Sequence, residues 1–102
     1  MTENVGKMRS VLCDKAGHAL MKAKQLERGA ATLPHVSQQR AEIEYLVAEL
    51  RAYERWIDGY LEAAEKEPLR EFEHIHRCYA QCIEYERQHG IRDVMLEYPE
   101  YN

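Results

Sequence analysis

The chain has 102 residues, of which 45% are apolar and 31% charged, and its formal net charge is -4 at pH 7. This length allows a single domain, and this balance excludes a disordered chain. An acidic chain is also a poor nucleic-acid ligand, because affinity for phosphate depends on clustered Lys and Arg.

The first predicted helix covers residues 3 to 28. Its apolar residues share one face at helical spacing, and they are Val5, Met8, Leu12, Ala16, Ala19, Leu20, Ala23 and Leu26. Thr2 is a suitable N-cap, and Gly29 is placed to end the helix. The alanines on this face favour close packing of a second helix.

The second predicted helix is the longest element, from residue 36 to residue 66. One row follows heptad spacing and comprises Val36, Gln39, Ile43, Leu46, Leu50, Tyr53, Ile57, Tyr60 and Ala64. A second row lies about 100° round the helix and comprises Tyr45, Ala48, Ala52, Trp56 and Ala63. Two rows predict two neighbours. Because the helix would be roughly 45 Å long, too long for a monomer of this size to cover, we expect a homodimer formed through it.

The third predicted helix covers residues 68 to 89. Pro68 fits a first helical turn, and Gly90 followed by Ile91 predicts a Schellman cap. Alternating steps of three and four predict one packing row, formed by Phe72, Ile75, Tyr79, Cys82, Glu86 and His89 and widened by Ile83. Residues 91 to 102 form a tail. The expected fold is all-α, a three-helix antiparallel bundle with a long central helix and a short C-terminal extension.

The stretch EHIHRCYAQCIEYERQHG, residues 73 to 90, concentrates histidine and cysteine. His74, Cys78 and Cys82 follow one another at single helical turns. A straight helix supplies two good zinc ligands, whereas a structural site needs four, so a site here would need a further ligand such as Cys13. We therefore expect no metal or other cofactor, and a metal or redox sensor using these residues is the alternative.

Other features of the sequence bear on activity and compartment. It contains no phosphate-binding loop, nucleophile elbow or zinc-protease motif, so we expect no enzyme. It lacks both a membrane-spanning apolar run and the apolar core of a signal peptide. Three cysteines form an odd set, which favours free thiols in a reducing compartment. We expect a cytoplasmic protein without direct contact with nucleic acid or membrane.

The residue types that dominate protein interfaces, Trp, Tyr and Arg, collect on the second helix. The predicted partner surface comprises Tyr45, Glu49, Ala52, Tyr53, Trp56, Tyr60, Glu86 and His89. A small helical protein with such a surface can cover an apolar region of its target, including one that the target uses to dimerise. The sequence therefore indicates stoichiometric binding of a protein partner.

In length, helical pattern, acidic balance and the stretch RAEIEYLVAELRAYERWIDGYLEAAEKE, the chain resembles small bacterial quorum-sensing anti-activators of the QslA kind. The resemblance implies an inhibitor that holds a LuxR-type transcriptional activator in a form unable to dimerise or bind DNA. A phage-type inhibitor or a secretion chaperone is a further alternative, which shares the binding mechanism and differs in its target.

Overall fold

The structure, a computed structural model, describes residues 2 to 96, and side chains from residue 5 onward. It contains α1 (Thr2–Ala30), α2 (Gln38–Lys66), the 3-10 turn η1 (Pro68–Arg70), α3 (Glu71–Gln88) and α4 (Arg92–Leu96). Residues 2 to 96 include no strand, so the expected all-α class is confirmed. No helix in this range has the length and apolar character needed to cross a membrane.

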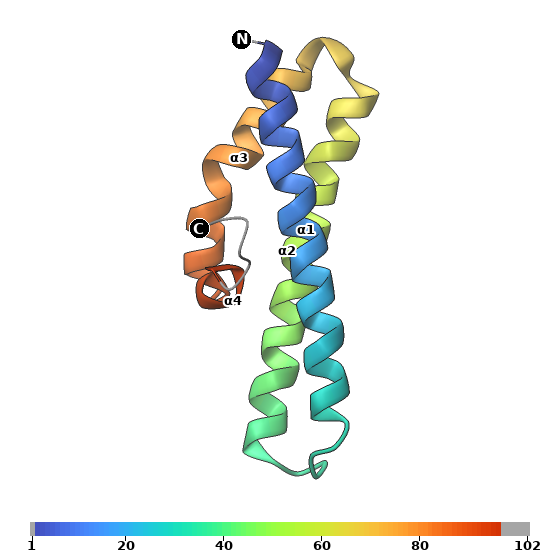
Figure 1. Cartoon of the computed structure of the whole chain (residues 1–102), viewed down its shortest axis with the longest axis vertical. Coiled ribbons are helices and arrows are strands. Elements are labelled where there is room, and N and C mark those ends of the chain that lie inside the picture. Colours follow the sequence, from blue (N-terminus) through green and yellow to red (C-terminus); the bar gives the residue numbers. More distant parts are fainter. Residues whose placement is uncertain (1, 97–102) are drawn as a thin grey trace.

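The two long helices form an antiparallel hairpin, and α3 packs along only part of it (Figure 1). Near the middle of the hairpin, His18 Nε2 donates to the Val94 carbonyl oxygen at 3.0 Å, and His89 Nδ1 donates to Glu49 Oε2 at 2.7 Å. We call the part formed by residues 19 to 48 the two-helix half. The part on the other side of these contacts, which contains α3 and α4, is the three-helix half.

The predicted apolar face of α1 is confirmed. Val5, Met8, Leu12, Ala16, Ala19 and Ala23 are all buried. On α2, the buried positions Leu50, Tyr53, Ile57 and Ala64 belong to the predicted heptad row. The small alanines of α1 allow α2 to approach closely, and the larger side chains of α2 fill the space toward α3.

The loop between the long helices differs from the prediction. Gly29 does not end α1, which runs on to Ala30, and positive φ occurs only at Gly90 among residues 2 to 96. Ser37 has extended φ and ψ, and its Oγ accepts from the Arg40 N–H at 3.3 Å, so α2 begins at Gln38. Val36, predicted to start the heptad row, therefore lies in the loop and is exposed.

Gly59 and Gly90 differ in their effect on the helices. α2 is continuous through Gly59, without a break. At Gly90, with φ of 71°, the Ile91 N–H donates to the Glu86 carbonyl at 3.0 Å and the Gly90 N–H to the Arg87 carbonyl at 3.3 Å. This is the predicted Schellman cap. It buries Ile91 and turns the chain back, so that α4 packs against α1 and α3.

Candidate functional site

A cluster of stacked rings joins α2 to α3 in the three-helix half. The Trp56 and Tyr85 rings stack with centroids 4.6 Å apart, and Tyr60 meets Trp56 edge-on at 5.3 Å. Tyr85 also stacks on His89 at 4.1 Å. Positions 56 and 60 lie on α2, and position 85 lies on α3 four residues before its C-cap, His89, so each pair lies on one side of its helix. We call these four partly exposed side chains the aromatic face.

The structure separates the predicted partner residues into three groups. Ala52 and Glu49 lie near the aromatic face on α2 and are partly exposed, whereas Tyr45 is exposed on the two-helix half. The prediction that Tyr53 and Glu86 belong to a partner surface is wrong: their exposed fractions are 0% and 3%. Both side chains point into the core, where they bond to each other and not to solvent.

Beneath the aromatic face lies a buried polar triad. Lys15 Nζ donates to Glu86 Oε2 at 2.6 Å, and the Tyr53 hydroxyl donates to the same oxygen. Each of the three helices supplies one member, so the triad fixes their relative positions. Burial, with the neighbouring Glu86 carboxylate as the next cause, raises the pKa of Tyr53 and keeps its hydroxyl a hydrogen-bond donor.

The histidine and cysteine residues of α3 are dispersed. Cys78 and Cys82 are buried, and burial raises the pKa of the Cys78 thiol to about 12. His74 instead lies 3.0 Å from a Glu67 carboxylate oxygen, and Cys13 is exposed on α1. Within residues 2 to 96, no three His, Cys, Asp or Glu side chains are grouped to hold a metal ion. The two buried thiols belong to the hydrophobic core cluster.

Cationic side chains border the aromatic face. A shallow groove of about 450 Å³ is lined by Arg55, Trp56, Gly59, Tyr60, Ala63, His74 and Arg77. No carboxylate of residues 5 to 96 lies within ion-pairing distance of Arg55, and Arg77 reaches Glu73 only at 3.6 Å. Gly59 has no side chain to fill the groove. The groove can therefore accept an apolar side chain with a carboxylate beside it.

A second surface was missed by the sequence interpretation. Phe72, Tyr79 and Ile83 were predicted to pack in the core, but they are 50%, 42% and 61% exposed. The buried residues of α3 are instead Ile75, Cys78, Cys82 and Glu86. Two rows on this helix follow three- and four-residue steps, and helical spacing alone does not show which one faces inward. The presence of two such rows was the available signal.

The chain matches no family model, and neither the curated proteins nor the solved structures provide a match.

Proposed function

We propose that this protein is a small regulator that acts by stoichiometric binding of a protein partner through the aromatic face. The observation that supports the proposal is the half-exposed stack of Trp56 on Tyr85 with the Arg55 guanidinium nearby. Trp, Tyr and Arg contribute most of the energy at measured interfaces, usually from the centre of a packed patch. An interface needs these groups and requires no catalytic side chain.

The groove beside Trp56 defines the chemistry of the bound segment. Its floor is aromatic and aliphatic, and its rim carries the guanidinium groups of Arg55 and Arg77. A side chain such as Leu or Phe would bury apolar surface against Trp56 and Tyr60. A neighbouring Asp or Glu would pair with a guanidinium, and an arginine can hold a carboxylate by two hydrogen bonds. The proposed ligand is thus an apolar segment with an acidic flank.

The aromatic face is held in place before any partner arrives. The triad bonds Tyr53 of α2 to Glu86 of α3, and His89 bonds to Glu49 across the same two helices. Because these two contacts hold α2 and α3 together, the helices lose little conformational entropy on binding. Preorganisation of this kind favours affinity, because binding then costs less ordering.

The proposed target is a LuxR-type transcriptional activator in the cytoplasm, as the resemblance to quorum-sensing anti-activators implies. By occupying the surface through which the activator dimerises, the protein would shift the activator toward monomers that do not bind DNA. Such inhibition depends on the ratio of the two concentrations and saturates when every activator is bound. No turnover is involved.

The test begins with affinity capture from the native cytoplasm, which identifies a candidate activator. Purified activator is then titrated with wild-type protein, Trp56→Ala or Tyr45→Ala, and activator dimer content and DNA binding are measured. We expect wild type to act stoichiometrically and Trp56→Ala to bind about tenfold or more weakly. Tyr45→Ala removes an exposed aromatic ring far from the groove and should bind like wild type.

Circular dichroism first establishes that both variants are folded. Equal binding by wild type and Trp56→Ala would contradict the proposed face, and activator that stays dimeric when saturated would contradict the mechanism.

A further inference from the structure

One face of α3 carries an exposed heptad row. Its side chains lie at successive steps of three, four, three and four residues, and they are Leu69, Phe72, His76, Tyr79 and Ile83. We call this row, which begins in η1, the α3 seam. All five side chains are exposed. Leu69, Phe72, Tyr79 and Ile83 are apolar or aromatic, and the fifth residue is a histidine.

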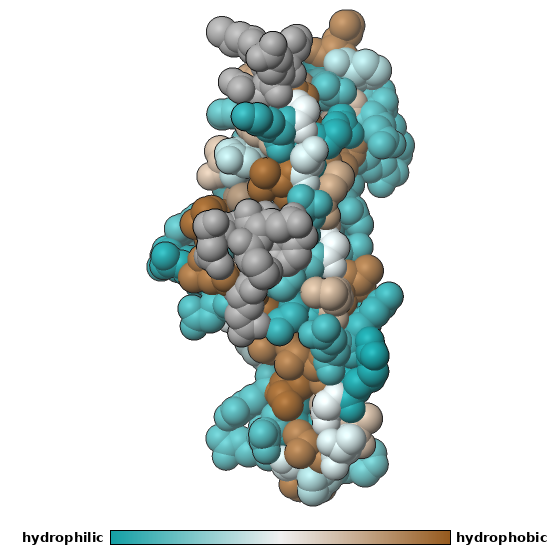
Figure 2. All heavy atoms as spheres, viewed as in Figure 1, coloured by the Kyte–Doolittle hydropathy of each residue, from teal (hydrophilic) through white to brown (hydrophobic). Residues whose placement is uncertain are grey.

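The α3 seam borders an open groove between α3 and α1. The groove has a volume of about 990 Å³ and reaches Val11 and Lys7 on α1. Phe72 and His76 stack at its edge with ring centroids 5.4 Å apart. Near the other end of the row, Ile83 shares a second hollow with Leu96 of α4. Hydrophobic residues, in brown, are visible between α1 and α3 in Figure 2.

The spacing of the seam defines the shape of its occupant. Steps that average 3.5 residues keep one face toward a neighbouring helix that runs nearly along the same axis, as in a coiled coil. From Phe72 to Ile83 the row spans roughly 16 Å, about three helical turns. A helix is therefore the occupant that would cover it.

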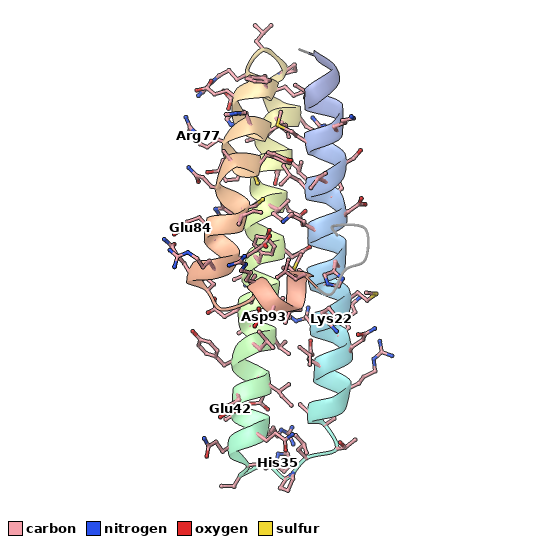
Figure 3. The ribbon with its side chains drawn as sticks, turned by 60° about the vertical axis from the view of Figure 1, so that its left-hand side comes forward. Lys22, His35, Glu42, Arg77, Glu84 and Asp93 are labelled. Atoms are coloured by element: carbon pink, nitrogen blue, oxygen red, sulfur yellow. The ribbon has the colours of Figure 1, made fainter. Side chains whose placement is uncertain are left out.

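The charges beside the seam indicate which helix fits. In chain order, the exposed flank of α3 reads Glu73, Arg77, Ala80, Glu84 and Arg87. A second α3 in antiparallel orientation, centred on Ala80, would place Glu73 opposite Arg87 of the partner subunit and Arg77 opposite Glu84 of the partner subunit. Each of these two carboxylates, which pairs with an arginine of its own α3, then also faces an arginine of the other copy. Figure 3 shows Arg77 and Glu84 projecting from α3 away from α1, where such contacts would form.

We propose that the protein is a homodimer in which the α3 helices of two copies pack antiparallel about a two-fold axis near Ala80, with Tyr79 and Ile83 of each α3 seam at the centre of the contact. The contact is isologous, so each copy offers the same surface and no open surface remains to extend the assembly. It replaces the dimer through α2 that the sequence suggested. The aromatic face lies on the α2 side of α3, so dimerisation leaves it accessible. This inference does not depend on the proposed function.

The first test is the molar mass of the full chain, measured by light scattering and sedimentation equilibrium over a range of concentrations. Wild type should have twice the chain mass of 12.0 kDa. Ile83→Glu places a charge at an exposed position of the seam, so the fold is retained and the dimer should dissociate about tenfold or more readily. Tyr45→Glu adds the same charge to exposed α2 and should remain dimeric.

A wild-type chain that stays monomeric at every concentration, or that forms more than two copies, would overturn the proposal. So would a Tyr45→Glu variant that dissociates while Ile83→Glu does not, because that result assigns the interface to α2.

The second test locates the axis. In a Cys13→Ala background, Ala80→Cys places two thiols near each other across the two-fold axis, and mild oxidation should link the copies covalently. Gln81→Cys, one position along and on the other side of α3, should remain unlinked. Linkage through residue 81 and not through residue 80 would place the contact on the aromatic face and refute the seam.

Discussion

The two halves of the α1–α2 hairpin bury different kinds of side chain. The three-helix half encloses large residues completely, including Leu12, Leu50, Ile57 and Ile75. The buried residues of the two-helix half are mostly alanines, together with Val47. Its larger apolar side chains, Leu26, Ile43 and Leu46, are only partly covered.

This difference follows from the third helix and not from helical pattern, which is similar along both helices. Two helices enclose small side chains at their contact line, whereas a third neighbour is needed to surround a Leu or Ile. Both candidate binding surfaces use α3. The three-helix half therefore supplies the rigidity on which the proposed binding would depend, and the two-helix half should open first.

The largest effect should come from the buried triad. Glu86→Ala removes the carboxylate that accepts from both the Lys15 ammonium and the Tyr53 hydroxyl in the core, and we expect a loss of about 3–5 kcal/mol in the free energy of unfolding. Chemical denaturation measures it.

The matched control replaces the whole triad with apolar residues of similar size, Lys15→Met, Tyr53→Phe and Glu86→Leu. It should recover most of the loss, because all three polar groups of the triad are then absent. A loss below about 1 kcal/mol for Glu86→Ala would mean that water reaches the triad. The three-helix half would then not enclose its side chains more completely than the two-helix half.

Two leucines on α2 compare the halves directly. Leu50 is fully buried and Leu46 is partly exposed one turn away. We expect Leu50→Ala to cost about 3 kcal/mol and Leu46→Ala about 1 kcal/mol, because a cavity forms only where surrounding atoms enclose the site. Urea unfolding of both variants measures the difference, and equal costs would show that the two halves are packed alike.

Alkaline pH should weaken the three-helix half through its thiols. The Cys78 pKa is raised by burial from 9.0 to about 12, so the folded chain holds its proton where the unfolded chain has lost it. Its contribution is complete below pH 9 and is lost as the pH rises toward 12.

Between about pH 8 and about pH 10.5, Cys78 should account for roughly 1–2 kcal/mol of the fall in unfolding free energy. In Cys78→Ala, the unfolding free energy should fall less over the same pH range, and the difference from wild type should equal this amount. Cys13→Ala, which alters an exposed thiol, should keep the wild-type dependence. If the unfolding free energy fell equally in wild type and Cys78→Ala, the Cys78 thiol would not be shielded from solvent in the folded chain.

The smallest effect concerns the start of α2. Ser37→Ala removes the acceptor for the Arg40 N–H and should cost about 0.5–1 kcal/mol. Since we expect the two-helix half to open locally, hydrogen exchange should accelerate in the first turn of α2 and remain unchanged in α3. Faster exchange in both places would mean that the molecule opens as one unit.

Predictions from the sequence were correct where the structure depends on residues within a single helix. The apolar face of α1 and the cap at Gly90 depend on local spacing and local backbone geometry. It failed for α3, where Phe72 and Ile75 both fit a packing row and only contact with α1 and α2 distinguishes them. The triad was also hidden, since Lys15 and Glu86 are 71 positions apart and only Glu86 is unusual in its own helix, as a charged residue on the predicted packing row. A charged residue on an apolar row indicates an interface as readily as a buried pair.

The separation of Lys15 from Glu86 also affects how the chain is completed during synthesis. Domains form from the N-terminal end as the chain leaves the ribosome, so α1 and α2 are available before α3 exists. Until residue 86 emerges, the ammonium of Lys15 has no Glu86 carboxylate and the hydroxyl of Tyr53 has no acceptor there. The nascent hairpin thus remains unfinished at its centre, and a prematurely ended chain lacks the core of the full-length protein.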